Sequence, residues 1–153
     1  MKAGWQVRPA TEADVGAWAG LRAALWPEDD ALSHAAEIRR ALANPHGTAG
    51  FLVIDADGRA CGFAEAVLRR DYVNGTGSSP VGFLEGWYVA PEARKQGAGR
   101  ALVAAVERWT REQGCTELAS DALLDNEAGH RAHAACGFGE TERVVYFRKR
   151  LHG

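Results

Sequence analysis

Apolar residues recur every three or four positions in several stretches of the chain, a spacing that places them along one side of a helix. The expected helices cover residues 12–25, 32–44, 99–113 and 125–136. Thr11 is a candidate N-cap for the first of them, with Asp14 at the N3 position, and Gly114 closes the third. These are the residue types that typically begin and end helices.

Shorter apolar or alternating runs predict strands at 5–10, 81–89, 115–120 and 141–150, and a hairpin over 51–68 around Asp57-Gly58. The element order is therefore β-α-α-β-β-β-α-β-α-β. An antiparallel meander followed by a β-α-β crossover is the most economical arrangement. We expect one domain over residues 1–153, of the α/β (α+β) class, in which helices flank a mixed, mostly antiparallel twisted sheet.

The composition limits which partners are expected. The 153 residues carry a formal net charge of −2, so no basic field is available for nucleic acid or an anionic membrane. No apolar stretch approaches the ~20 residues that cross a bilayer, and the N-terminal residues contain no apolar signal core. We expect a cytoplasmic protein that binds neither nucleic acid nor a membrane.

Three widely spaced cysteines, Cys61, Cys115 and Cys136, argue against a disulfide framework and against a zinc site. We interpret them as small packing residues, and we expect no metal.

A glycine-rich segment, "ARKQGAGRAL" at residues 93–102, lies between the strand at 81–89 and the helix at 99–113. It lacks the Lys-Ser/Thr pair of a Walker loop, and position 102 is Leu where a dinucleotide fingerprint needs a third glycine. Backbone N–H groups at a helix N-terminus can nevertheless bind an anion, and Gly97 and Gly99 would let a phosphate approach closely. An ordinary tight turn with solvated cations is the alternative.

The spacing Arg94-x-x-Gly97-x-Gly99 resembles the acyl-CoA pyrophosphate loop of the Gcn5-related N-acetyltransferases (GNAT), and the element order is similar as well. This resemblance implies a GNAT-like fold and acetyl-CoA as cosubstrate. The implied loop residues are Arg94, Lys95, Gln96, Gly97, Ala98, Gly99 and Arg100, and the implied pantetheine-binding strand residues are Trp87, Tyr88 and Val89.

A later family motif matches Asn126, followed seven residues on by His133 where the family usually has a tyrosine. The resemblance implies that both residues border the coenzyme. His133 is either a proton donor to the departing thiolate or a partly buried helix histidine without a chemical role.

Acidic residues near strand and helix ends suggest an acidic pocket. Glu85 lies on the strand "VGFLEGWYV", and strict alternation places it on the same face as Phe83 and Trp87. A carboxylate among large apolar groups has a raised pKa and needs a partner, whereas a sheet-edge glutamate would simply point to water. The further acids are Glu28, Asp29, Asp30, Asp121, Glu140 and Glu142. An acidic pocket favours a polycationic amine as acetyl acceptor.

Longer segments narrow the resemblance. "LWPEDD", "DYVNGT", "SSPV", "CTELASDALLDN" and "ETERVVYFRK" are similar to the aminoglycoside 6′-N-acetyltransferases over roughly residues 5–151. This likeness implies an aminoglycoside antibiotic as acceptor, antibiotic resistance as the outcome, and a homodimer.

The roles expected from this interpretation are those of a direct transfer. Glu85 would be the general base, Asp121 a second candidate or an ammonium ligand, and the Val89 N–H the oxyanion donor. Trp26 and Tyr72 would offer aromatic faces to sugar rings, unless they are a core residue and a loop anchor. Glu140 would pair with an outlying amine. An acetyltransferase for another amine and a non-catalytic acyl-CoA-binding module are the alternatives, with a nucleotide-binding protein as a third.

Overall fold

The computed structural model describes residues 4–152. Its contacts divide the chain into two compact units, and the boundary between them in the sequence follows Asp121. The first unit contains β1 (Gln6–Pro9), α1 (Val15–Leu25), α2 (Ala31–Leu42), β2 (Thr48–Ile54), β3 (Ala60–Arg69), β4 (Val81–Val89), α3 (Ala98–Glu112) and β5 (Leu118–Ser120). Single 3-10 turns at Glu12–Asp14 and Pro91–Ala93 precede α1 and α3. The second unit contains α4 (Glu127–Ala135).

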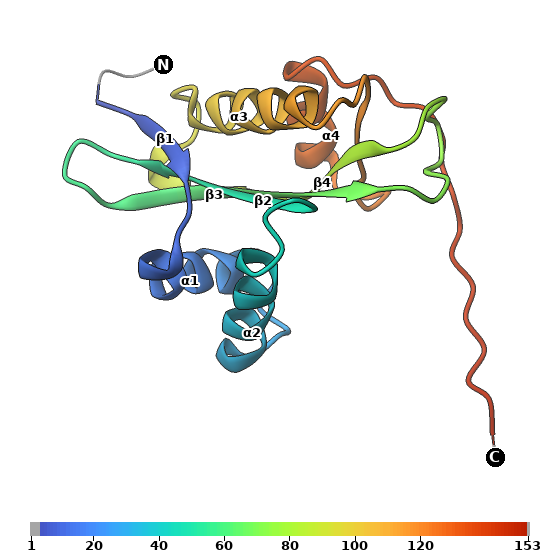
Figure 1. Ribbon diagram of the computed structural model, residues 1–153, viewed down its shortest axis with the longest axis horizontal. Coiled ribbons are helices and arrows are strands. Elements are labelled where there is room, and N and C mark those ends of the chain that lie inside the picture. Colours follow the sequence, from blue (N-terminus) through green and yellow to red (C-terminus); the bar gives the residue numbers. More distant parts are fainter. Residues whose placement is uncertain (1–3, 153) are drawn as a thin grey trace. The chain divides into compact units, whose positions relative to one another are not determined.

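The strands of the first unit form one sheet in the order β1-β2-β3-β4-β5. Each of the first four strands pairs antiparallel with its neighbour, and β5 lies parallel to β4. Helices α1 and α2 cover one face and α3 covers the other (Figure 1). The expected class, a mixed and mostly antiparallel sheet flanked by helices, is confirmed.

Both faces of the sheet are packed with apolar side chains. Trp18, Ile38 and Phe63 form the core under α1 and α2, and each is at most 1% exposed. On the other face α3 buries Leu102 and Val106, two members of the helical repeat seen in the sequence. The predicted capping pair is present, because the Thr11 N–H donates to Asp14 Oδ2 at 2.7 Å. Thr11 caps the 3-10 turn Glu12–Asp14 that leads into α1, however, and the N-cap of α1 itself is Asp14.

A β-bulge interrupts β4 at Glu85. Glu65 of β3 lies opposite Gly86, but the next residue, Ala66, lies opposite Leu84, so Glu85 is the extra residue. Directly paired residues share a face, which puts Phe83 on the α1/α2 face and Trp87 on the α3 face. The prediction that Glu85, Phe83 and Trp87 share one face is therefore wrong, because it assumed unbroken alternation.

Strand β4 separates from β5 just before the bulge. Within residues 4–152 their pairing covers only Gly82–Leu84 against Leu118–Ser120. On the other edge, the Ala90 N–H donates to the Cys61 carbonyl at 2.8 Å. In an antiparallel ladder the preceding residue, Val89, then directs its own N–H and C=O away from β3, toward the edge that β5 leaves open.

The second unit consists of α4 and a long segment without regular structure. Asn126 caps α4, and Gly137, with φ +90°, follows its end. Residues 138–152 form neither helix nor strand, so the strand predicted at 141–150 is not present. The alternation there is suitable for a strand, but a strand also needs a hydrogen-bonded neighbour.

The buried cysteines confirm the packing interpretation for two of the three thiols. Cys61 and Cys115 are 4% and 6% exposed, and burial raises the pKa of the Cys61 thiol to about 11. Cys61 and Cys115 are free thiols.

None of the helices between residues 4 and 152 is both long and apolar enough to cross a membrane.

Candidate active site

A pocket of about 530 Å³ opens on the α1/α2 face of the sheet, where β4 bulges. Its walls come from α1, α2, β2, β3 and β4 and from the turns that follow the two helices. The lining residues are Arg22, Trp26, Asp29, Glu37, Arg40, Ala41, Asn44, Thr48, Glu65, Val67 and Glu85. Four carboxylates and two guanidinium groups therefore face one hollow, which gives it an excess of negative charge.

The bulge presents Glu85 to this pocket. Its side chain is 40% exposed in an otherwise buried stretch of strand, and Arg69 Nη2 lies 3.3 Å from its Oε1. The Arg69 guanidinium in turn lies over the Phe83 ring, 4.2 Å from the centroid. The expected apolar surroundings are not found, because a cation from the neighbouring strand accompanies the carboxylate.

Trp26 forms the wall beside Glu85. It follows the last residue of α1, with Arg22 Cζ 4.8 Å from its ring centroid and the Phe63 ring edge-on at 6.1 Å. A Cβ at Gly86 would lie only 2.6 Å from Trp26 Cη2, so the indole packs directly on the β4 backbone. The structure thus brings together two of the predicted residues, Trp26 and Glu85.

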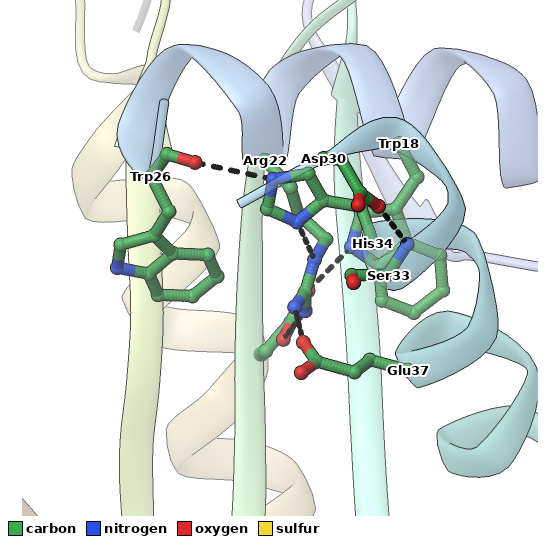
Figure 2. Close-up of polar contacts among 8 residues, drawn as sticks. Trp18, Arg22, Trp26, Asp30, Ser33, His34 and Glu37 are labelled. Carbon is green, nitrogen blue, oxygen red and sulfur yellow. Dashed lines mark hydrogen bonds and ion pairs between the residues drawn. The ribbon is translucent and has the colours of Figure 1, made fainter. Parts of the chain in front are cut away.

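Four charged residues of this pocket were not among the predicted residues: Arg22, Glu37, Arg40 and Glu65. Arg22 Nη1 donates to both Glu65 oxygens, at 2.6 and 2.7 Å, and Arg22 Nη2 donates to Glu37 (Figure 2). Trp18 Nε1 donates to Glu65 Oε2 at 2.7 Å. Burial raises the pKa of the Glu65 carboxyl, and the nearby Arg22 and the Trp18 N–H oppose that rise.

The sequence contains a signal for these residues. Arg22 interrupts the apolar stripe of α1, and Glu65 interrupts an apolar strand, just as Glu85 does. A charge in an apolar stripe indicates either a solvated edge or a buried partner. Only the fold reveals that these two charges are partners.

His34 joins the same group from α2. The Trp26 carbonyl can only accept, so His34 Nε2 donates to it at 3.2 Å, and Nδ1 accepts from Arg22 Nε at 3.1 Å (Figure 2). Of the acids expected at this turn, Asp29 lines the pocket. Asp30 instead caps α2, accepting the Ser33 N–H at 2.7 Å.

The glycine-rich turn has the backbone of an anion site. Lys95 and Gly97 adopt positive φ angles, +63° and +88°, and Gly97 is the N-cap of α3. A glycine has no side chain to accept the first-turn N–H groups, so these groups remain available to a diphosphate.

Two polar side chains of the turn donate to backbone carbonyls. Arg94 Nε donates to the Val89 carbonyl at 2.7 Å, and its guanidinium lies 5.5 Å from the Tyr88 ring centroid. Gln96 Nε2 donates to the Glu92 carbonyl at 3.1 Å. Arg94 uses only Nε in its bond to the Val89 carbonyl, and the exposed cations of the turn are Arg94, Lys95 and Arg100.

Trp87 ties β4 to the start of α3. Its Nε1 donates to the Gly99 carbonyl at 3.1 Å, and a Cβ at Gly99 would lie 3.4 Å from its ring. The strand expected to hold pantetheine and the turn expected to hold the diphosphate are therefore directly connected.

Tyr72 and Asp121 lie outside the pocket lining. Tyr72 is 71% exposed on the loop that joins β3 to β4. Glu117 Oε1 anchors that loop by accepting from the Gly77 N–H at 2.9 Å and the Ser78 hydroxyl at 2.5 Å. Asp121 is exposed and follows β5 directly.

Three predicted residues belong to the second unit. Asn126 Oδ1 accepts the Gly129 N–H at 3.0 Å as the cap of α4. His133 is half-buried, donates from Nδ1 to the Gly129 carbonyl at 2.7 Å and meets the Phe138 ring edge-on. Glu140 is exposed, and Arg143, 2.7 Å away, lowers the pKa of its carboxyl.

Among residues 4–152 there is no group of three or more histidine, cysteine or acidic side chains arranged to hold a metal ion.

Comparison with known proteins identifies the family of this chain. Residues 17–138 match the acetyltransferase (GNAT) family. An aminoglycoside N(6′)-acetyltransferase type 1 from Stenotrophomonas maltophilia is 59% identical over 146 residues, covering 95% of this chain and 93% of that protein.

Solved structures give the same result. The aminoglycoside 6′-N-acetyltransferase AAC(6′)-Ih from Acinetobacter baumannii superposes with a TM-score of 0.91 at 43% identity, over 97% of this chain and 100% of the other. AAC(6′)-Iy in complex with the bisubstrate analogue CoA-S-monomethyl-acetylneamine gives a TM-score of 0.92 at 43% identity, with the same coverage. The chain therefore belongs to the acetyltransferase (GNAT) family, and within it to the aminoglycoside N(6′)-acetyltransferases.

Proposed function

We propose that this protein transfers the acetyl group of acetyl-CoA directly to the 6′-amino group of an aminoglycoside, with both substrates bound together, and so confers antibiotic resistance. The overall reaction is that of its family. The observation that carries the residue roles is the bulge of β4, which presents Glu85 to an acidic pocket at the point where β4 leaves β5.

Acetyl-CoA would bind along β4 and the turn before α3. The first-turn N–H groups of α3, with Arg94, Lys95 and Arg100, suit the diphosphate. The open edge of β4 suits the pantetheine amides, because a strand without a neighbour offers N–H and C=O groups in a row. The Val89 N–H points to this edge and would stabilise the oxyanion as the acetyl group is transferred.

The aminoglycoside would bind in the pocket, whose carboxylates attract a polycation. Trp26 provides an aromatic wall for a sugar ring. The proposal also includes the substrate or coenzyme contacts that the family resemblance implies for five further residues: Tyr72, Asp121, Asn126, His133 and Glu140.

Glu85 would act as the general base, directly or through a water. An amine is largely protonated near neutral pH, and attack on the thioester requires one proton to be removed. Glu85 is suited to accept it because the bulge leaves its carboxylate accessible from the pocket. Holding the two substrates together supplies much of the remaining acceleration.

The experiment is to measure kcat and its pH profile for Glu85→Gln. We expect kcat to fall by roughly 10²–10⁴, with the acidic limb of the profile removed. Glu12→Gln is the matched control, because Glu12 also forms an exposed ion pair, with Arg39 at 3.4 Å. Full activity of Glu85→Gln at every pH would exclude Glu85 as the base.

A panel of acceptors separates the alternatives. Thiol release with a kanamycin-type aminoglycoside supports the proposal, whereas release only with polyamines or peptides would identify another amine acetyltransferase. CoA binding without turnover on any amine would indicate a non-catalytic module, and heat protection by ATP but not CoA would indicate a nucleotide-binding protein.

We also propose a homodimer in the cytoplasm, where acetyl-CoA is available. The second unit exposes several large apolar side chains, which single soluble subunits usually cover. They are Leu123, Leu124, Val144, Val145, Tyr146, Phe147 and Leu151.

A further inference from the structure

Arg22 is a deeply buried cation for which the proposed mechanism has no role. Only 5% of the residue is exposed, yet it lines the pocket that would receive the acceptor. It contacts Glu37 and His34 of α2 and the ring of Trp26, which follows α1 (Figure 2). It also contacts Glu65 of β3.

Stability alone is a weak explanation for such an arrangement. Removing two charges from water is costly, and an apolar pair of similar size often stabilises a core as well or better. The planar guanidinium does offer something that an apolar side chain lacks, because its donors have fixed directions. Here the donors fix Glu65, Glu37 and His34 relative to one another.

A short chain of contacts connects Arg22 to Glu85, the proposed general base. Its guanidinium lies against Trp26, and Trp26 packs on Gly86, which follows Glu85 in β4. Arg22 Nε also holds His34, which in turn donates to the Trp26 carbonyl. Arg22 therefore holds the Trp26 ring by direct contact and the Trp26 carbonyl through His34.

The two carboxylates beside Arg22, Glu65 and Glu37, differ in how many further hydrogen bonds they can accept. Both Glu65 oxygens are occupied by Arg22, and one of them also by Trp18. Glu37 is 46% exposed and uses Oε2 for Arg22, whereas its Oε1 makes no hydrogen bond to another residue in the described part of the chain. Arg22 thus holds Glu37 in place with one oxygen still able to accept from an ammonium group.

We propose that Arg22 is a positioning residue for the acetyl acceptor: it fixes Trp26 and Glu37 on the pocket wall and so sets where the amino sugar lies relative to Glu85. This inference rests on the proposed function. Small displacements of a bound reactant have large effects on rate, so loss of the guanidinium geometry affects acceptor use far more than coenzyme use.

The test is Arg22→Lys, which keeps the positive charge but removes the planar guanidinium and its directed N–H donors. We expect the KM for a kanamycin-type aminoglycoside to rise at least about tenfold and kcat to fall, while the KM for acetyl-CoA stays within about twofold. A purely structural role would lower the amount of active protein and leave both KM values unchanged.

Arg8→Lys is the matched control. Arg8 also forms a two-pronged pair, with Asp14 at 2.7 and 2.8 Å, but it does not line the pocket. We expect this variant to lose stability without a change in either KM. If Arg22→Lys does not fold, Glu37→Gln at a half-exposed site decides the question, with an expected rise in acceptor KM of about threefold or more.

The outcomes are distinct. A wild-type protein that acetylates the aminoglycoside, together with an unchanged acceptor KM in Arg22→Lys, or in Glu37→Gln where the former does not fold, overturns the role of Arg22 alone. A wild-type protein that neither binds nor acetylates any aminoglycoside overturns the proposed function and this inference together.

Discussion

At the scale of single residues, the environment of a carboxylate decides what that carboxylate does. Asp14 accepts two hydrogen bonds from Arg8 and one from the Thr11 backbone, and the Arg8 guanidinium holds the pKa of Asp14 well below its ordinary value. Glu65 is shifted in the opposite direction, because burial favours its protonated form. Glu85, half-exposed beside Arg69, remains accessible from the pocket.

The lowered pKa of Asp14 predicts how stability depends on pH. A carboxyl whose pKa is lower in the folded state stabilises the fold at any pH above its pKa in the unfolded chain, which is about 3.9 for aspartate. This contribution to stability is lost as the pH falls from that value through the folded-state pKa. We expect Asp14→Asn to lower the free energy of unfolding at pH 7 by about 1–3 kcal/mol. Urea unfolding between pH 7 and pH 2 measures both effects.

In that experiment the difference between wild type and Asp14→Asn should shrink as the pH falls below about 4. Asp71→Asn, at an exposed loop position, is the control and should follow the wild type throughout. A constant difference at all pH values would contradict the assignment.

At the scale of elements, the turn between β4 and α3 depends on backbone conformation. Gly97 has φ +88°, a region that β-branched residues avoid. Gly114, with φ +83° at the other end of α3, has the same conformation and open space around its Cβ position. The two glycines therefore form a matched pair at opposite ends of one helix.

Valine at either position should lower the free energy of unfolding by about 1–3 kcal/mol, because both would be forced into the left-handed region. Only Gly97→Val should also weaken CoA binding, by about tenfold or more, since the N-terminal amides of α3 would be displaced. Isothermal titration with CoA measures the difference. Equal CoA affinity in the two variants would disprove the diphosphate site.

The elements themselves were largely predictable from sequence, and the exceptions have physical causes. Periodicity and end signals located α1–α4 and β1–β5 within a few residues. The bulge at Glu85 was missed because alternation rules assume two residues per repeat. The strand predicted at 141–150 failed because a suitable pattern does not supply a pairing partner.

The site was less predictable than the fold. Glu85 and Trp26 were found because each stands out locally, as an acid in an apolar strand and an aromatic residue before Pro27. Arg22 and Glu65 are 43 positions apart, and nothing local to either residue reveals the other. Contacts of this kind follow from the packing of α1 on β3 and become visible only with the fold.

At the scale of the whole molecule, exposed apolar groups indicate assembly. Val145 and Phe147 are 77% and 92% exposed, in a segment without helix or strand. A surface of this kind on a soluble chain typically marks a contact with another protein. The homodimer of the proposed function gives that contact a partner.

We expect light scattering after size-exclusion chromatography to give twice the 16.4 kDa chain mass. The double variant Val145→Asp, Phe147→Asp should shift the protein toward the monomer, because buried unpaired carboxylates are costly at an interface. Leu32→Asp, which replaces an isolated exposed leucine of α2, is the control and should remain dimeric. A monomeric wild type would refute the dimer.

The single additional residue in β4 has a consequence for how this protein can change over time. Before it, Phe83 lies on the face covered by α1 and α2; after it, Trp87 lies on the face covered by α3 and contacts the glycine-rich turn. In the proposed function, the aminoglycoside and acetyl-CoA would therefore bind toward opposite faces of the sheet, on either side of the bulge. On that proposal, substitutions that adapt the pocket to new antibiotics would accumulate on the first face and leave the coenzyme-binding residues of the second unchanged.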